Sequence, residues 1–182
     1  MRSRRGGLLQ FALVLVVLGG GAVALGLLDR SGTPVAGQAQ VHDGDTISLD
    51  GNRIRIVGID APEYAQTCMD RSGGEWPCGK AARDAMLALV KGQEVSCLSE
   101  GRDKYGRMLG RCFVGKTDLG AAMIDAGLAV SYDDYKLRET AARAGGRGIW
   151  AGSFVIPSEW RRTSGEAEPE FDFLTWLLGL FR

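Results

Sequence analysis

The chain has 182 residues, of which 45% are hydrophobic and 24% are charged, and its formal net charge at pH 7 is zero. This length accommodates one globular domain with short extensions, and the neutral balance provides no overall positive field that would attract polyanions. Because His42 is the single histidine, histidine-rich metal sites are excluded, and no nucleophile-elbow motif accompanies it to suggest a serine hydrolase.

The N-terminus combines a basic segment with a long apolar segment. Three arginines lie within residues 1–7, and residues 8–28 follow with Gln10 as their one strongly polar side chain. An apolar stretch of this length can span a bilayer, and the preceding arginines favour a cytoplasmic N-terminus. We therefore predict a basic cytoplasmic segment (1–7) and a transmembrane anchor (8–28), with the remaining chain on the extracytoplasmic side. The alternative is a signal peptide that is cleaved near residues 37–39, so that the domain is secreted.

Residues 29–39 are small and polar and are interpreted as a linker, which leaves residues 40–162 as the globular domain. The first two strands are expected at residues 40–49 and 52–59. Asp50 and Gly51 separate these apolar runs, and both residues tolerate the positive φ angles of a tight hairpin turn. Asp43 and Asp45 are two positions apart, so an extended strand would direct both carboxylates to one face.

The second half of this hairpin adds further charged side chains. Arg53 and Arg55 alternate with core-facing residues, and Asp60 and Glu63 follow where Pro62 ends the strand. Clustered carboxylates repel one another unless a cation lies among them, and oxygen ligands suit Ca²⁺ or Mg²⁺. The pattern indicates a metal site at the rim of a sheet. For any single residue of the set, an ordinary surface salt bridge is the alternative.

Four cysteines are present, which permit three disulfide pairings. Cys68 and Cys78 bound a glycine-containing loop, and Cys97 and Cys112 flank a predicted hairpin. We therefore favour the pairs Cys68–Cys78 and Cys97–Cys112, which fit an oxidising compartment. A zinc site is the alternative, although no C-x-x-C spacing supports it.

The remaining pattern alternates short strands with helices. Apolar residues recur at helical spacing from Lys80 to Gly92, strands are expected at residues 94–98 and 108–114, and Asp118 is a plausible N-cap for a helix over residues 119–126. A strand-like run (128–132) precedes a third helix, which Asp133 or Asp134 would cap and which would end near residue 144. About five short strands avoid open edges by closing into a small barrel that carries the helices, an α+β fold.

The end of the chain (163–182) is first acidic and then strongly apolar, and it is too short to span a bilayer. Three placements are open for this tail: a membrane interface, an unknown protein partner, or its own domain.

Residues 103–107 read Asp-Lys-Tyr-Gly-Arg and form the second charged cluster. Arg107 presents a fork of donors that matches phosphate oxygens, Lys104 adds a point charge, and Tyr105 can stack on a base. A solvated hairpin tip is the alternative interpretation of this segment.

Three motifs together resemble the staphylococcal-nuclease-like (thermonuclease) family. They are Asp-Gly-Asp-Thr at residues 43–46, Arg55 followed by Asp-Ala-Pro-Glu at residues 60–63, and the segment 103–107. The resemblance extends to residues 127–129 and 149–150 and covers roughly residues 40–160. It implies a five-stranded OB-fold barrel with three helices, and hydrolysis of DNA and RNA phosphodiesters that depends on Ca²⁺ rather than Mg²⁺ or Mn²⁺.

The resemblance also implies a role for individual residues. These are the metal ligands Asp45, Asp60 and, through its backbone carbonyl, Ala61; the catalytic residues Arg55, Glu63 and Arg107; and the substrate-binding residues Lys104, Tyr105 and Tyr132.

The sequence therefore predicts a monomeric, membrane-anchored endonuclease that acts on DNA or RNA outside the cytoplasm. The alternative is a membrane-tethered module that binds nucleic acid without cleaving it. The joint presence of Asp45, Arg55, Asp60, Glu63 and Arg107 favours the enzyme, because binding alone does not require all five.

Overall fold

The computed structural model describes residues 34–132 and 134–165. The predicted anchor (8–28), the first part of the predicted linker (29–33) and most of the C-terminal tail lie outside these residues. Within the described residues, no helix combines the length and apolar character needed to cross a membrane.

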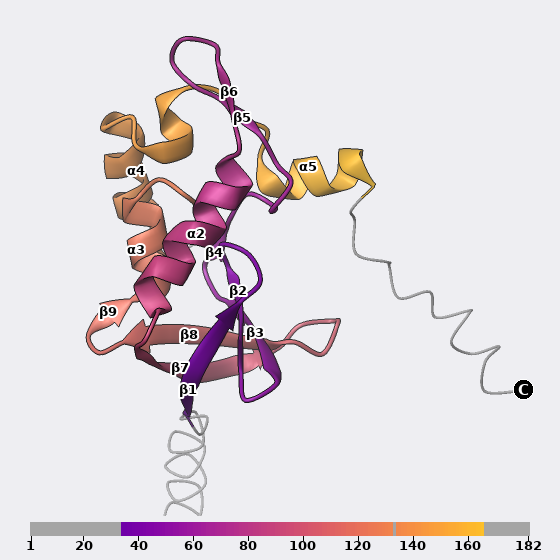
Figure 1. Ribbon diagram of the computed structural model, residues 1–182, viewed down its shortest axis with the longest axis vertical. Coiled ribbons are helices and arrows are strands. Elements are labelled where there is room, and N and C mark those ends of the chain that lie inside the picture. Colours follow the sequence, from indigo (N-terminus) through magenta and orange to yellow (C-terminus); the bar gives the residue numbers. More distant parts are fainter. Residues whose placement is uncertain (1–33, 133, 166–182) are drawn as a thin grey trace, which may run out of the picture. The chain divides into compact units, whose positions relative to one another are not determined.

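Five strands form a closed barrel (Figure 1). They are β1 (Val35–Val41), β2 (Thr46–Leu49), β3 (Asn52–Ile56), β7 (Glu94–Arg102) and β8 (Met108–Val114). The hydrogen-bonded order is β3-β2-β1-β7-β8, with antiparallel pairs throughout, and a parallel pairing of β3 with β8 closes the ring. The short strand β9 (Thr117–Asp118) pairs with the end of β8. The predicted α+β barrel is confirmed.

The barrel interior and two helices share one hydrophobic core. Alternate residues of β3, Ile54 and Ile56, are fully buried, as the period of two in a half-buried strand requires. Helices α2 (Cys78–Val90) and α3 (Leu119–Asp125) add Met86 and Met123, among others, to the same cluster. Asp118 caps α3 as predicted, since its side chain accepts a hydrogen bond from the Ala121 amide.

The remaining elements surround this core. Strand β4 (Ile59–Asp60) pairs with β10 (Val130–Ser131), and β5 (Cys68–Met69) pairs with β6 (Glu75–Trp76). Helix α4 (Lys136–Ala144), the 3₁₀ helix η1 (Gly148–Ala151) and helix α5 (Pro157–Ser164) complete the described chain. Both predicted disulfides, Cys68–Cys78 and Cys97–Cys112, are present.

The first predicted strand is wrong, because residues 40–49 form the end of β1, a turn and β2. The carboxylate of Asp43 accepts a hydrogen bond from the Asp45 amide at 2.9 Å, which stabilises a tight turn in place of an extended strand. Asp43 and Asp45 therefore belong to one turn at the barrel edge. Strand β1 also begins at Val35, so the end of the predicted linker is part of the sheet.

Two helix predictions also need correction. Helix α4 is preceded by Tyr135 at the N-cap position, and Asp134 instead pairs with Arg111. Helix α5 was not predicted, so the described chain has four α-helices where three were expected. Its local signals are Pro157 in the first turn and Gly165 at the C-cap with φ of 72°.

Candidate active site

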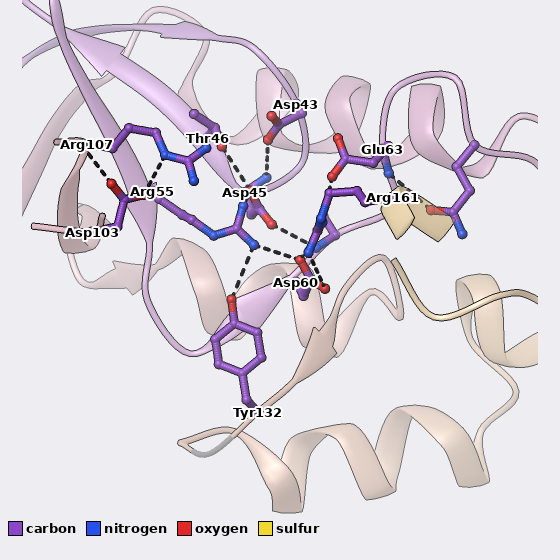
Figure 2. A network of polar contacts seen from close by, with 12 residues as sticks. Asp43, Asp45, Thr46, Arg55, Asp60, Glu63, Asp103, Arg107, Tyr132 and Arg161 are labelled. Carbon is purple, nitrogen blue, oxygen red and sulfur yellow. Dashed lines mark hydrogen bonds and ion pairs between the residues drawn. The ribbon is translucent and has the colours of Figure 1, made fainter. Parts of the chain in front are cut away.

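Asp45 lies at the centre of a buried polar network (Figure 2). Its side chain is nearly inaccessible, and one carboxylate oxygen accepts hydrogen bonds from Arg55 at 2.8 Å and from the Thr46 hydroxyl at 3.0 Å. The other oxygen accepts the Ala61 amide at 3.0 Å. Thr46 and Arg55 are directly paired across the β2–β3 hairpin, which places Arg55 beside Asp45. The hairpin turn at Asp50 and Gly51 therefore sets the contact between Arg55 and Asp45.

Asp60 joins the network from strand β4. Its Oδ1 accepts a hydrogen bond from Nη2 of Arg55 at 2.7 Å, so one guanidinium bridges the carboxylates of Asp45 and Asp60. Both carboxylates are buried. The structure thus brings together the two predicted metal carboxylates and one predicted catalytic arginine. The sequence analysis expected this cluster, although it placed Asp45 on a strand.

Burial and ion pairing have opposite effects on the pKa values of Asp45 and Arg55. Burial raises the pKa of Asp45 from its ordinary value of 3.8 to about 7, although the neighbouring Arg55 guanidinium and the Ala61 amide favour the ionised form. Burial by itself would lower the pKa of Arg55, but Asp45, Tyr132 and Asp60 raise it above its usual value. Arg55 therefore stays protonated, while Asp45 is poised to change charge near neutral pH.

Glu63 lies in the loop after β4 and is partly buried. Burial raises the pKa of its carboxyl group, and the hydrogen bond from Arg161, at 2.6 Å, works in the opposite direction. A buried carboxylate with a raised pKa can accept a proton near neutral pH more readily than an exposed one.

Arg161, on helix α5, is the site residue that the sequence analysis missed. Its Nη1 atom lies 3.0 Å from Oδ1 of Asp60, and its Nη2 atom lies 3.2 Å from Oδ2 of the same residue. With the bond to Glu63, one guanidinium bridges two predicted site carboxylates. The boundary signals at Pro157 and Gly165 could have predicted the helix, but no local pattern relates Arg161 to residues about one hundred positions earlier in the chain.

Arg107 is held by Asp103 in the turn between β7 and β8. The Asp103 carboxylate accepts Nε of Arg107 at 2.7 Å and the backbone amides of Tyr105 and Arg107 at 2.9 Å each. Burial would raise the pKa of Asp103, but these bonds lower it below its usual value. Asp103 is therefore an ionised support for the arginine, a role that the sequence analysis did not assign.

The strand register relates Arg107 to Arg55. Arg55 pairs with Leu109, and Ile54 pairs with Met108, across the parallel β3–β8 contact. Ile54 and Met108 belong to the core, so Arg55 lies on the outward face of β3. Arg107 is the last residue of the turn before β8 and therefore adjoins the paired end of these two strands. Figure 2 shows both side chains within the same polar region.

The predicted substrate-binding residues come from two places. The Lys104 ammonium lies 4.9 Å, and the Arg107 guanidinium 5.3 Å, from the centre of the Tyr105 ring. The Tyr132 hydroxyl accepts a hydrogen bond from Nη2 of Arg55 at 3.3 Å. Burial raises the pKa of Tyr132, which remains a neutral phenol.

Two hollows adjoin these residues. The first has a volume of about 470 Å³ and includes Arg53, Arg102, Tyr105 and Arg107 in its lining, so it is strongly basic. The second, of about 430 Å³, adjoins Asp60 and Arg161 and is otherwise mostly apolar, with aromatic residues from the segment around η1 in its wall. Guanidinium groups thus line the first hollow, whereas the second is lined mainly by apolar surface.

The donor chemistry of the site fits a hard divalent cation. Asp45 and Asp60 offer carboxylate oxygens, and Ala61, which follows Asp60 in the chain and donates its amide to Asp45, also has a backbone carbonyl oxygen. Among the described residues, however, no group of three or more acidic, histidine or cysteine side chains is placed to hold an ion. The guanidinium groups of Arg55 and Arg161 supply the compensating positive charge in this arrangement.

Comparison with known proteins agrees with this geometry. The profile of a family described as staphylococcal nuclease homologue matches residues 53–152, a region that includes Arg55, Asp60, Glu63 and Arg107 but neither Asp45 nor Arg161. The probable staphylococcal-like nuclease CAN1 of Oryza sativa subsp. japonica is 34% identical over 136 residues, which are 70% of this chain and 38% of that protein.

Two bacterial proteins are also similar. The succinoglycan biosynthesis protein ExoI of Rhizobium meliloti (strain 1021) is 38% identical over 124 residues, which are 64% of this chain and 65% of that protein. An uncharacterized endonuclease of Escherichia coli O157:H7 is 34% identical over 129 residues, which are 65% of this chain and 78% of that protein. The chain thus spans less than two thirds of the first of these proteins and of the rice nuclease.

Proposed function

The chain belongs to the family of staphylococcal nuclease homologues, and from this premise we propose that it is a metal-dependent endonuclease that hydrolyses phosphodiester bonds of DNA, RNA or both. The observation that carries the proposal is the placement of two arginines, Arg55 on β3 and Arg107 at the end of the turn that leads into β8, where these strands close the barrel beside the carboxylates of Asp45 and Asp60.

The two arginines would bind the phosphate. Guanidinium donors match phosphate oxygens, and their attraction strengthens as negative charge builds in the transition state. Each arginine is already oriented, because Asp45 and Asp60 hold Arg55 while Asp103 holds Arg107. This preorganisation means that little side-chain freedom is lost when the substrate binds.

Glu63 would position or deprotonate the attacking water. Burial raises the pKa of its carboxyl group, which makes it a stronger base than an exposed carboxylate. A divalent cation, with Ca²⁺ as the proposed ion, would be held by Asp45, Asp60 and the Ala61 carbonyl, and it would supply positive charge to the phosphate. Lys104, Tyr105 and Tyr132 would then contact the flanking nucleotides.

We also propose that the domain works outside the cytoplasm, attached to the membrane by residues 8–28 or released by signal cleavage. The two disulfides support this location, because such bonds persist mainly in oxidising compartments. The basic hollow beside Arg107 supports a nucleic-acid substrate in a chain without net positive charge.

A nicking assay tests the activity. The purified full chain is incubated with supercoiled plasmid and with single-stranded DNA and RNA, in Ca²⁺, Mg²⁺, Mn²⁺ or a chelator. Cleavage that needs a divalent ion is expected. Arg107→Ala and Glu63→Gln should each slow cleavage by about 100-fold or more while the melting temperature is retained.

Arg138→Ala is the matched control, since Arg138 is an exposed arginine of α4 that forms an ion pair with Asp125, away from the site. It should leave the rate unchanged. A loss of less than about tenfold in both site variants would remove the assigned roles. Binding of the same substrates without any cleavage would favour the membrane-tethered binding module instead.

A further inference from the structure

Helix α5 places a guanidinium between two carboxylates of the site. Nη1 of Arg161 donates to Oδ1 of Asp60 at 3.0 Å and to Oε1 of Glu63 at 2.6 Å, and Nη2 donates to Oδ2 of Asp60 at 3.2 Å. Figure 2 shows the Arg161 side chain directed between these two acids. Both oxygens of Asp60 are therefore occupied by this one arginine.

This position is the one that a cation would need. Asp60 and Glu63 lie close enough to share one guanidinium, and two neighbouring carboxylates repel each other unless positive charge compensates them. Arg161 supplies that charge from a segment outside the residues that the family profile matches. A divalent ion within about 4 Å of the guanidinium would in turn be repelled by it.

The helix itself is lightly attached. Pro157 is the single buried residue of α5, and the exposed side chains of Arg162 and Glu159 form only a peripheral pair at 3.9 Å. A helix with so little buried surface can move without opening the hydrophobic core. Displacement of Arg161 from the carboxylates is therefore compatible with an intact barrel.

We propose that Arg161 is a positioning residue that sets the affinity of the site for divalent cations. It acts as the resident counterion of Asp60 and Glu63, and a cation binds the Asp60 carboxylate only when Arg161 moves away. This inference rests on the metal site of the proposed function and goes beyond it, because metal binding at Asp60 and the observed position of Arg161 on α5 become mutually exclusive. Such coupling is reciprocal, so the cation must also loosen α5.

Calorimetric titration of the full chain with CaCl₂, without substrate, tests the proposal. Arg161→Met keeps most of the side-chain volume and removes the competitor, so the Kd for Ca²⁺ should fall by about tenfold or more. Arg161→Lys keeps the charge but loses the fork, and its Kd should lie between those of the other two proteins. Arg162→Met removes an equal charge from the neighbouring exposed position and should change the Kd by less than about twofold.

Hydrogen exchange provides a second measurement on the wild-type chain. Saturating Ca²⁺ should accelerate exchange of the α5 amides and leave the barrel strands unchanged. If Arg161→Met fails to fold, as judged by its melting curve, Arg161→Lys and this measurement decide the question.

An unchanged or weaker Ca²⁺ affinity in Arg161→Met would overturn the inference, as would the absence of Ca²⁺ binding up to millimolar concentrations in every protein. Nicking rates on the same samples separate the two proposals. Altered Ca²⁺ affinity without cleavage contradicts the proposed nuclease alone, whereas metal-dependent cleavage with unaltered affinity contradicts the role of Arg161 alone.

Discussion

Gln66 connects the loop that carries Glu63 to the segment that leads into α5. Its side chain is fully buried and donates from Nε2 to the carbonyl oxygen of Val155 at 2.7 Å. Its side-chain Oε1 atom accepts a hydrogen bond from the backbone amide of Glu63 at 3.3 Å. The backbone amide of Gln66 donates to the Glu63 carbonyl at 2.8 Å. One buried amide side chain thus ties the Glu63 loop to the segment that precedes α5.

Replacing Gln66 by leucine should destabilise the protein. The change removes the hydrogen bonds to the Val155 carbonyl and the Glu63 amide, and each such bond contributes about 0.5–1.5 kcal/mol to stability. Urea denaturation measures the loss in the free energy of unfolding. Gln93→Leu, at an exposed position, is the control and should change this free energy by less than about 0.5 kcal/mol. Equal free energies of unfolding for the two variants would show that the Gln66 contacts do not stabilise the protein.

Gly79→Ala tests the packing of α2 against the Glu63 loop. A Cβ atom at residue 79 would lie 1.6 Å from the Glu63 carbonyl oxygen, so the loop or the helix must shift. Alanine favours a helix over glycine by about 1 kcal/mol, but overpacking of this kind costs about 1–3 kcal/mol, and the clash should dominate. We expect a lower melting temperature together with slower cleavage.

Gly37→Ala is the matched control for this substitution. Its Cβ would meet only the Asp50 carboxylate, at 3.4 Å, which is ordinary contact. It should therefore retain both the melting temperature and the cleavage rate of the wild type. A Gly79→Ala protein that behaves in the same way would argue against close packing of α2 on the loop.

The raised pKa of Asp45 predicts how stability depends on pH. Because the pKa rises from 3.8 in the unfolded chain to about 7 in the fold, the native state binds a proton more tightly than the unfolded state. The contribution of this group to stability is therefore complete below pH 3.8 and is lost as the pH rises toward 7. The slope cannot exceed about 1.4 kcal/mol per pH unit for one proton.

Asp45→Asn isolates this contribution, because asparagine keeps the shape and cannot titrate. The free energy of unfolding of the wild type, relative to the variant, should decrease between about pH 4 and pH 7. Urea denaturation at several pH values provides the measurement. A relative stability that increases over this window would show that ion pairing with Arg55 outweighs burial and holds the pKa below its ordinary value.

The disulfide between Cys97 and Cys112 should stabilise the barrel. It joins directly paired residues of β7 and β8, both fully buried, across a separation of 15 residues. Removing a native disulfide that closes a loop of this size costs about 2–4 kcal/mol. The double variant Cys97→Ala/Cys112→Ala should therefore unfold at lower denaturant concentration. A midpoint equal to that of the wild type would contradict this expectation.

Local chemistry was sufficient to predict much of the fold. Asp50 and Gly51 have φ angles of 49° and 80°, as the hairpin signal required, and helical spacing located α2. Asp118 caps α3, and both cysteine pairs form as their spacing suggested. These features depend on residues that are near neighbours in the chain or that a single hairpin brings together, and sequence patterns report such relationships directly.

Tertiary structure alone decided that Arg161 pairs with Asp60 and Glu63. The bond between Arg161 and Asp60 joins residues 101 positions apart, and that between Arg161 and Glu63 joins residues 98 positions apart. The periodicity of apolar residues shows which face of a segment is buried. Ion pairs have no such period, because each charge pairs with whichever opposite charge the folded chain brings near. The sequence by itself therefore determined the barrel, its hairpin and its motif residues, whereas the packing of α5 placed a second guanidinium, that of Arg161, between Asp60 and Glu63.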